Sequence, residues 1–212
     1  MAIRRAVTKL LSGRTRHRAR NRQAERNLPA VRCVPRRAAA AGGGRQRIRR
    51  DRFSEIFGAM ERPVTKDDLS KMRYCDAVIN ETLRLYPPVP VIMRYADRDL
   101  QLDGCTIPRG ATCAISVWGA GRAACWGADA DQFRPERWFD TLRLPPPSAF
   151  SPFSYGRRSC IGKRYAMALM KTILVHLLRR FKFESEDNEL EFKVDIALRT
   201  TRGHLIKVQS RN

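Results

Sequence analysis

The residues best suited to chemistry surround Cys160, in the run PFSYGRRSCIGKRYA. This cysteine stands in a glycine-bounded loop, directly before a segment with helical periodicity. The free amides and the dipole at the start of a helix stabilise a thiolate, and amide hydrogen bonds to the sulfur tune a metal attached to it. An isolated cysteine near a helix end is more often a buried, inert side chain. Here the flanking residues agree with a thiolate, so we expect Cys160 to be a metal ligand.

Four neighbours at fixed spacing support this expectation. Gly156 and Gly162 allow the backbone to turn and to approach a flat cofactor closely. Phe153 supplies an apolar wall, and Arg158 can reach an anionic group on such a cofactor.

The run matches the pattern F-x-x-G-x-R-x-C-x-G, and through it the chain resembles the cytochrome P450 family. In that family the cysteine is the proximal ligand of a haem iron, and its electron donation favours cleavage of the O–O bond. The resemblance therefore implies a haem cofactor (iron protoporphyrin IX), with Cys160 as the catalytic and iron-binding residue. The implied haem-binding positions around it are Phe153, Gly156, Arg158 and Gly162.

A second motif, E-x-x-R, lies in NETLRLYPPVP. Glu81 and Arg84 are three residues apart, so they share one face of a helix and can pair. Alone the spacing means little, because most such pairs are exposed salt bridges. The resemblance implies a buried pair joined by Arg137 of the run FRPERW, a structural triad that holds the haem-side core in shape.

Arg94, in VIMRYADRD, matches the family position that pairs with a haem propionate. On the residues alone, an exposed arginine at a strand end is the alternative. The resemblance covers residues 53–212, which correspond to the last third of the family fold, and it is similar to the branch that includes fatty-acid hydroxylases, particularly insect-like members.

Turn signals and periodicity predict the elements that position these residues. Thr65-Lys66-Asp67-Asp68 predicts a capping box at the start of a helix that ends at Tyr86-Pro87-Pro88. Asp103-Gly104 predicts a hairpin turn, and residues 119–150 are expected to form a loop. The predicted fold class is mainly α with small β-sheets, the C-terminal part of the P450 fold.

A second long helix is expected from about Lys163 to Phe181, after the Cys160 loop. Its apolar stripe comprises Ala166, Leu169, Met170, Ile173, Leu174, Leu177 and Leu178. Alternation in residues 190–196 predicts a strand, residues 205–208 its returning partner, and Gly203 the turn between them.

The charge of the 212-residue chain is unevenly distributed. The net charge is +21, and residues 1–50 contribute +15 of it through 16 Lys and Arg and one acid, Glu25. This Arg-rich extension is expected to be disordered. A phosphate-binding tail, a mitochondrial transit segment and non-native coding sequence are the alternatives.

Cysteine and histidine usage limits the other classes of site. Six cysteines include no C-x-x-C pair, and three histidines do not provide the common spacing of a zinc site. The chain contains no run of about 18 apolar residues, so no membrane span is predicted.

The sequence near the proposed ligand is basic. The residues concerned are Arg157, Arg158, Lys163, Arg164 and Lys171. By resemblance, an acidic flavoprotein reductase docks on the face carrying Lys163 and Arg164 and delivers electrons from NADPH.

The leading hypothesis is a haem-thiolate monooxygenase that inserts one oxygen atom from O₂ into an apolar organic substrate. The family's oxygen-activating helix and membrane anchor have no counterpart upstream of residue 53. The alternative is therefore a truncated, catalytically inactive family remnant. A nucleic-acid-binding role depends only on residues 1–50 and is the least favoured. By resemblance the full-length relative lies at the endoplasmic reticulum membrane, although this chain shows no anchor or signal.

Overall fold

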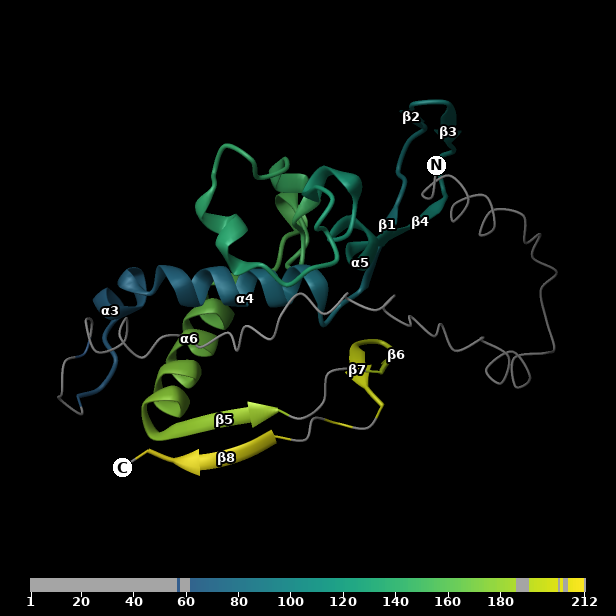
Figure 1. Ribbon diagram of the computed structural model, residues 1–212. Helices are drawn as coiled ribbons and strands as arrows, with labels where there is room; N and C mark the ends of the chain where they lie inside the picture. Colours follow the sequence, from purple (N-terminus) through teal and green to yellow (C-terminus); the bar gives the residue numbers. More distant parts are fainter. Residues whose placement is uncertain (1–56, 58–61, 186–190, 202, 204–205, 212) are drawn as a thin grey trace. The chain divides into compact units, whose positions relative to one another are not determined.

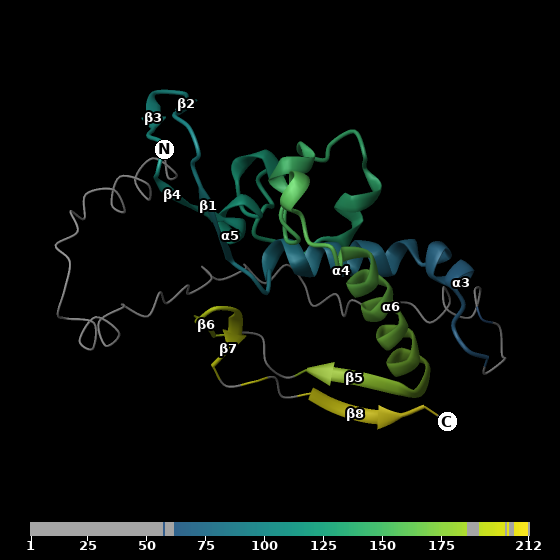
Figure 2. The same ribbon diagram turned by 180° about the vertical axis from the view of Figure 1, so that it is seen from behind.

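The computed structural model describes residues 57, 62–185, 191–201, 203 and 206–211 (Figure 1; Figure 2). All of them belong to one compact unit of the chain, residues 33–212. The prediction of a disordered extension at residues 1–50 lies outside the described residues. The described part combines helices with four small two-stranded sheets, which confirms the predicted fold class.

Two helices stand where the sequence predicted one. Helix α3 spans Lys66–Lys71 and α4 spans Arg73–Leu85. Thr65 caps α3 with the expected capping box, because its side chain accepts the amide of Asp68 while Asp68 accepts the amide of Thr65. The chain breaks at Met72, whose ψ of 54° is not helical. The predicted single helix was wrong at this one residue.

The cap of α3 is reinforced by an arginine. Arg62 donates two hydrogen bonds to the Asp68 carboxylate, at 2.6 and 2.8 Å. These bonds, with those from Thr65, hold the pKa of Asp68 well below its usual range. The start of α3 is therefore fixed by a charged group that stays ionised.

After Pro87 and Pro88 the chain forms extended hairpins. Strand β1 (Val91–Tyr95) pairs antiparallel with β4 (Thr112–Ser116). Between them, β2 (Leu100–Leu102) and β3 (Cys105–Ile107) form the predicted hairpin, and Gly104 takes the positive φ of its turn. Short helix α5 (Val117–Ala120) follows β4.

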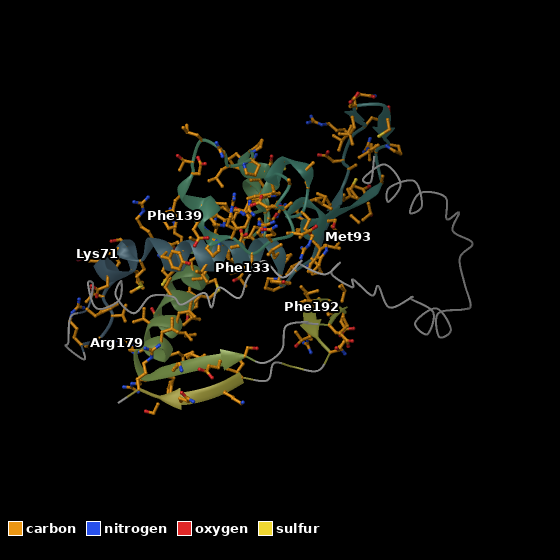
Figure 3. All side chains as sticks on the ribbon, viewed as in Figure 1. Lys71, Met93, Phe133, Phe139, Arg179 and Phe192 are labelled. Carbon is orange, nitrogen blue, oxygen red and sulfur yellow. The ribbon has the colours of Figure 1, made fainter. Side chains whose placement is uncertain are left out.

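Residues 121–162 are mostly irregular, as predicted for much of this stretch, but contain four short 3₁₀ turns. The turns are η2 (Ala124–Trp126), η3 (Pro135–Phe139), η4 (Pro147–Ala149) and η5 (Gly156–Arg158). Turn η3 packs on α4, and Figure 3 shows side chains crowding where this stretch meets α4. Tyr74 of α4 stacks there on Phe139, with ring centroids 6.2 Å apart.

Helix α6 spans Lys163–Arg180, as predicted, and contacts α3 and α4. Its packed face differs from the apolar stripe. Val175 is fully buried and Lys171 is nearly so, whereas Leu169, Ile173 and Leu177 are exposed. Val175 packs with Phe57, Met72 and Cys75 in an apolar cluster. The prediction that Lys171 belongs to the exposed basic face was wrong, because the residue lies inside this contact.

The C-terminal strands pair differently from the prediction. Strand β5 (Phe181–Ser185) continues from α6 and pairs with β8 (Ile206–Ser210). Strand β6 (Phe192–Val194) pairs with β7 (Leu198–Thr200) instead of with residues 205–208. The tight turn that allows this pairing lies at residues 195–197, so Gly203 is outside it.

The β6–β7 hairpin is tied to the end of α4. The Leu198 amide donates to the Pro88 carbonyl at 2.8 Å, and the Phe192 ring lies 5.1 Å from that of Tyr86. Within the part of the chain that the structure describes, every helix is too short or too polar to cross a bilayer.

Candidate functional site

Cys160 lies in an exposed loop directly before α6. Its backbone amide donates to the Phe153 carbonyl at 2.8 Å, which closes the loop, and its carbonyl accepts the Lys163 amide at 3.4 Å. The Ala166 amide donates to the Gly162 carbonyl at 2.8 Å and begins the helix. The loop is therefore attached to the first turn of α6, and the thiol of Cys160 is free and exposed.

The backbone of this loop takes two left-handed conformations. Ser154 has φ 64° and Gly156 has φ 77°. A Cβ at Gly156 would meet no atom within 4 Å, so glycine serves the conformation there and not a close approach. A Cβ at Gly162 would lie 3.7 Å from the Cys160 sulfur, an ordinary contact.

Arg94 of β1 reaches the same loop. Its guanidinium donates to the Ser154 hydroxyl at 2.5 Å and to the Met93 carbonyl at 2.8 Å. Ser154 is six residues before Cys160 in the loop that the Phe153 carbonyl closes. The structure thus brings the predicted propionate partner to the loop that carries the predicted thiolate. Arg158 is exposed at the end of η5, and Phe153 is half-buried.

Glu81 accepts hydrogen bonds from both predicted partners. Its Oε1 lies 2.8 Å from Arg84 Nη2 and 3.0 Å from Arg137 Nε, and its Oε2 lies 2.9 Å from Arg84 Nε. Two donors that the sequence analysis missed complete the shell: the Arg134 amide at 2.8 Å and the Trp138 indole at 3.1 Å. The carboxylate has no exposed surface.

The two arginines extend this network to backbone carbonyls. Arg84 donates to the carbonyls of Gly121, Ala130 and Gln132, so its five N–H groups all find acceptors. Arg137 donates to the carbonyls of Trp126 and Asp129. The network therefore connects α4 to the whole of residues 121–138. We call these residues the Glu81 network: Glu81, Arg84, Gly121, Arg134, Arg137 and Trp138.

Two opposed effects act on the ionisation of Glu81. Burial raises the pKa of this carboxyl, but the hydrogen bonds from Arg84, Arg137 and the Arg134 amide outweigh burial and hold its pKa below the ordinary value. The carboxylate is thus ionised at neutral pH, between two guanidinium groups.

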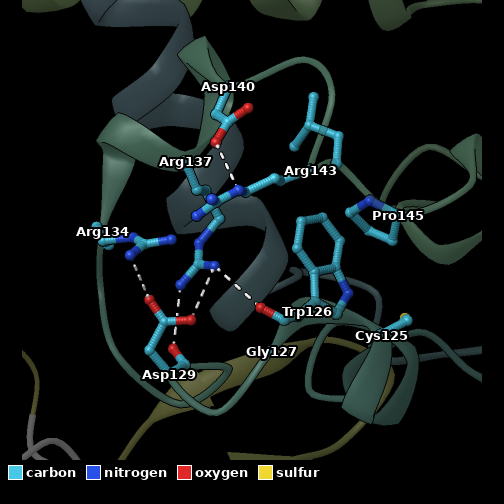
Figure 4. Close-up of a pocket in the computed structure, with 10 residues that line it drawn as sticks. Cys125, Trp126, Gly127, Asp129, Arg134, Arg137, Asp140, Arg143 and Pro145 are labelled. Atoms are coloured by element: carbon cyan, nitrogen blue, oxygen red, sulfur yellow. Dashed lines mark hydrogen bonds and ion pairs between the residues drawn. The ribbon is translucent and has the colours of Figure 1, made fainter.

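A cavity of about 300 Å³ opens on the far side of Arg137 from Glu81 (Figure 4). Its charged groups pair with one another: Arg134 with Asp129 at 2.9 Å, and Arg143 with Asp140 at 3.4 Å. Arg137 also reaches Asp129, at 3.4 Å. The pairs are internal to the lining, so the cavity is part of the scaffold around the Glu81 network.

Comparison with known proteins agrees with this geometry. The family described as Cytochrome P450 matches residues 48–208. The chain belongs to the cytochrome P450 family. Cytochrome P450 4V2 of Mus musculus is 39% identical over 163 residues, which are 76% of this chain and 31% of the relative. Cytochrome P450 4g15 of Drosophila melanogaster is 39% identical over 75% of this chain and 29% of its own length.

A solved structure supports the same P450 assignment. The crystal structure of a cytochrome P450 (CYP102L1) superposes with a TM-score of 0.69 at 26% identity, over 76% of this chain and 37% of that chain. The predicted family and its P450 fold are therefore confirmed. The chain spans about a third of the length of the curated P450 relatives that it matches.

The residues present fit a haem of the P450 type. The donor is a free, exposed cysteine at a helix start, where a thiolate is stabilised. Arg94 and Arg158 contribute guanidinium groups to the same loop or its edge, and such groups bind carboxylates well. The open space beside Gly156 leaves the loop free of side-chain obstruction there.

Arg122 stands in a run, Gly121-Arg122-Ala123-Ala124, that departs from the His-Arg-Asp-Pro frequent in the family. Its guanidinium lies 3.6 Å from the centre of the Trp118 ring and 5.8 Å from that of Tyr86. It also pairs with Asp131 at 3.6 Å. Aromatic packing thus anchors this arginine next to the Glu81 network.

Proposed function

We propose that this chain forms the proximal, thiolate-bearing part of a haem-thiolate monooxygenase. The observation that carries the proposal is the Cys160 loop itself, in which a free exposed cysteine precedes α6 and matches the family pattern. In this proposal Cys160 binds the haem iron, and Arg94 and Arg158 pair with the haem propionates. Phe153, Gly156 and Gly162 shape the surface against the ring.

Each of these residues has a physical task. The helix start and the loop amides favour the thiolate form of Cys160, so the sulfur is ready to bind iron at neutral pH. Ser154 holds the Arg94 side chain at the loop through a 2.5 Å hydrogen bond. The Glu81 network keeps residues 121–138 fixed against α4, which is a scaffolding role and not a chemical one. Haem, when bound through a cysteine thiolate, supplies the activation of O₂ for insertion of one oxygen atom into an apolar substrate.

Electron supply is the second part of the proposal. Lys163 and Arg164 are exposed on the first turn of α6, next to the loop. They offer a basic surface for an acidic flavoprotein reductase that carries electrons from NADPH. Lys171 is not part of this surface. An address at the endoplasmic reticulum membrane stays a prediction from the resemblance.

The decisive test is the spectrum of the haem-reconstituted chain after reduction and exposure to carbon monoxide. A thiolate-type Soret band is expected in the wild type and should be lost in Cys160→Ser. Cys125→Ser is the matched control, because Cys125 is also free and exposed but lies outside the loop. A thiolate-type band that persists in Cys160→Ser would refute the assignment. Absence of any haem uptake by the wild type would favour the inactive remnant.

A further inference from the structure

Lys171 is a buried lysine that the proposed haem chemistry does not use. Only 8% of the residue is exposed, although it lies in the middle of α6 among residues that are half-buried or exposed. A buried ammonium group is costly unless it is paired and hydrogen-bonded. Its surroundings must therefore supply specific partners.

The partners come from both helices that meet at the Met72 break. The Lys171 ammonium lies 2.7 and 2.8 Å from the two oxygens of Asp76, in the first turn of α4. It also donates to the Leu69 carbonyl of α3 at 2.8 Å. In a continuous helix that carbonyl would accept the amide four residues later. At the break, a lysine about 100 residues away in sequence is its donor.

An apolar contact lies one turn further along α6. Val175 is fully buried against Met72 and Cys75. Apolar contact is non-directional, so it would tolerate a small slide of α6 along α4. Hydrogen bonds are directional and short, and Lys171 makes them to two different helices. The lysine therefore defines one position of α6 along its own axis.

That position determines where Cys160 lies. Eight residues of helix separate Lys171 from Lys163, a rise of about 12 Å. The Cys160 loop is bonded to the first turn of α6, while Arg94 reaches the loop from β1. A shift of α6 would thus move the sulfur relative to the guanidinium of Arg94.

We propose that Lys171 is a positioning residue, which fixes α6 at the α3–α4 junction and so places Cys160 for iron binding. The inference rests on the proposed role of Cys160 as the iron ligand. It assigns to Lys171 a task distinct from reductase docking, to which its sequence neighbourhood pointed.

The first test needs no haem. Spin labels are attached to Cys160 and to a cysteine introduced by Thr82→Cys, at an exposed position of α4, with the other cysteines outside the core replaced by serine. Wild-type Lys171 should give one narrow distance distribution. Lys171→Met, which removes the charge but keeps much of the volume, should shift or broaden it, and Lys171→Arg should restore much of it. Lys182→Met is the control, because Lys182 pairs with Glu184 at 2.7 Å on an exposed strand.

The second test uses the haem-loaded full chain. At equal haem content, Lys171→Met should lose thiolate-type carbon monoxide band in favour of a band from iron without thiolate, and Lys182→Met should not. Haem affinity should fall by roughly tenfold, the lower end of the loss seen when supports of a metal ligand are removed.

The two tests separate the possible failures. An unchanged spin-label distance in Lys171→Met overturns the positioning role whatever the haem data show. A changed distance with an intact thiolate band at equal haem content reduces Lys171 to a structural residue and also overturns the proposal. If the wild type shows no thiolate band, the proposed function fails, and the spin-label distance alone then decides whether Lys171 positions Cys160.

Discussion

The Glu81 network and the Cys160 loop differ in how their polar groups are satisfied. Glu81, Arg84 and Arg137 are 0%, 1% and 6% exposed, and their donors and acceptors are matched by residues of this chain. In the Cys160 loop the sulfur and the Arg158 side chain are exposed, and the neighbouring Ile161 side chain points fully into solvent. The first region is closed upon itself, whereas the second presents its functional groups outward.

The difference separates scaffold from site. Side-chain pairing holds the Glu81 network, so its geometry depends on several charges being present together. Backbone conformation and a single closing hydrogen bond, from Cys160 to Phe153, hold the loop. We therefore expect substitutions in the network to act on stability, and substitutions in the loop to act on haem uptake.

Glu81→Gln should have the largest effect on stability. It leaves the charges of Arg84 and Arg137 without their buried carboxylate, which costs about 3–5 kcal/mol when one partner of a buried ion pair is removed. Denaturant unfolding followed by circular dichroism measures the loss. Glu136→Gln is the control, because Glu136 is exposed and accepts one hydrogen bond, from the Tyr74 hydroxyl.

Acid titration sharpens this prediction. The pKa of Glu81 is lower in the folded chain than its ordinary value of 4.5, so the unfolded chain binds the proton first as the pH falls. The stability that Glu81 contributes is thus present above about pH 4.5 and is lost as the pH falls through the folded pKa. Glu81→Gln should flatten this part of the stability–pH curve. An unchanged slope would mean that other carboxylates, such as Asp68, dominate it.

Gly121→Ala should come next. A Cβ at Gly121 would lie 2.2 Å from the Arg84 carbonyl oxygen, so the backbone of α4 or α5 must move. Overpacking of this kind costs about 1–3 kcal/mol. Gly119→Ala offers a comparison in the same short helix, because its Cβ would meet only the Ser116 hydroxyl, at 3.1 Å. Equal melting temperatures for the two variants would contradict the close approach at Gly121.

The sequence predicted local features better than distant pairings. The cap at Thr65, the hairpin turn at Gly104 and helix α6 each depend on signals within a few residues, and each was predicted. The break at Met72, the burial of Lys171 and the pairing of β5 with β8 depend on partners far away in sequence. No periodicity records such partners. For example, Lys171 has the spacing of a surface residue and becomes a core residue only through Asp76 and Leu69.

The candidate site shows the same division. The pattern around Cys160 and the E-x-x-R spacing identified residues that the structure brings close to one another within each region. The Trp138 indole and the Arg134 amide, both bound to Glu81, were missed. Trp138 directly follows Arg137, so its position in FRPERW was the available signal. Ser154, the partner of Arg94, had no signal at all, because a serine in a glycine-rich loop suggests only a turn.

Gly156→Ala is expected to have the smallest effect on stability and a separate effect on haem uptake. Alanine at φ 77° costs about 1–2 kcal/mol through backbone strain alone, because no atom lies within 4 Å of the new Cβ. Gly203→Ala is a closely matched control, with φ 77° and the same open surroundings, but it lies outside the Cys160 loop. The two variants should lose similar stability in denaturant, while haem titration should show weaker uptake for Gly156→Ala only. Equal uptake losses would make haem binding a consequence of overall stability, and the contrast between a closed scaffold and an open site would then not describe this chain.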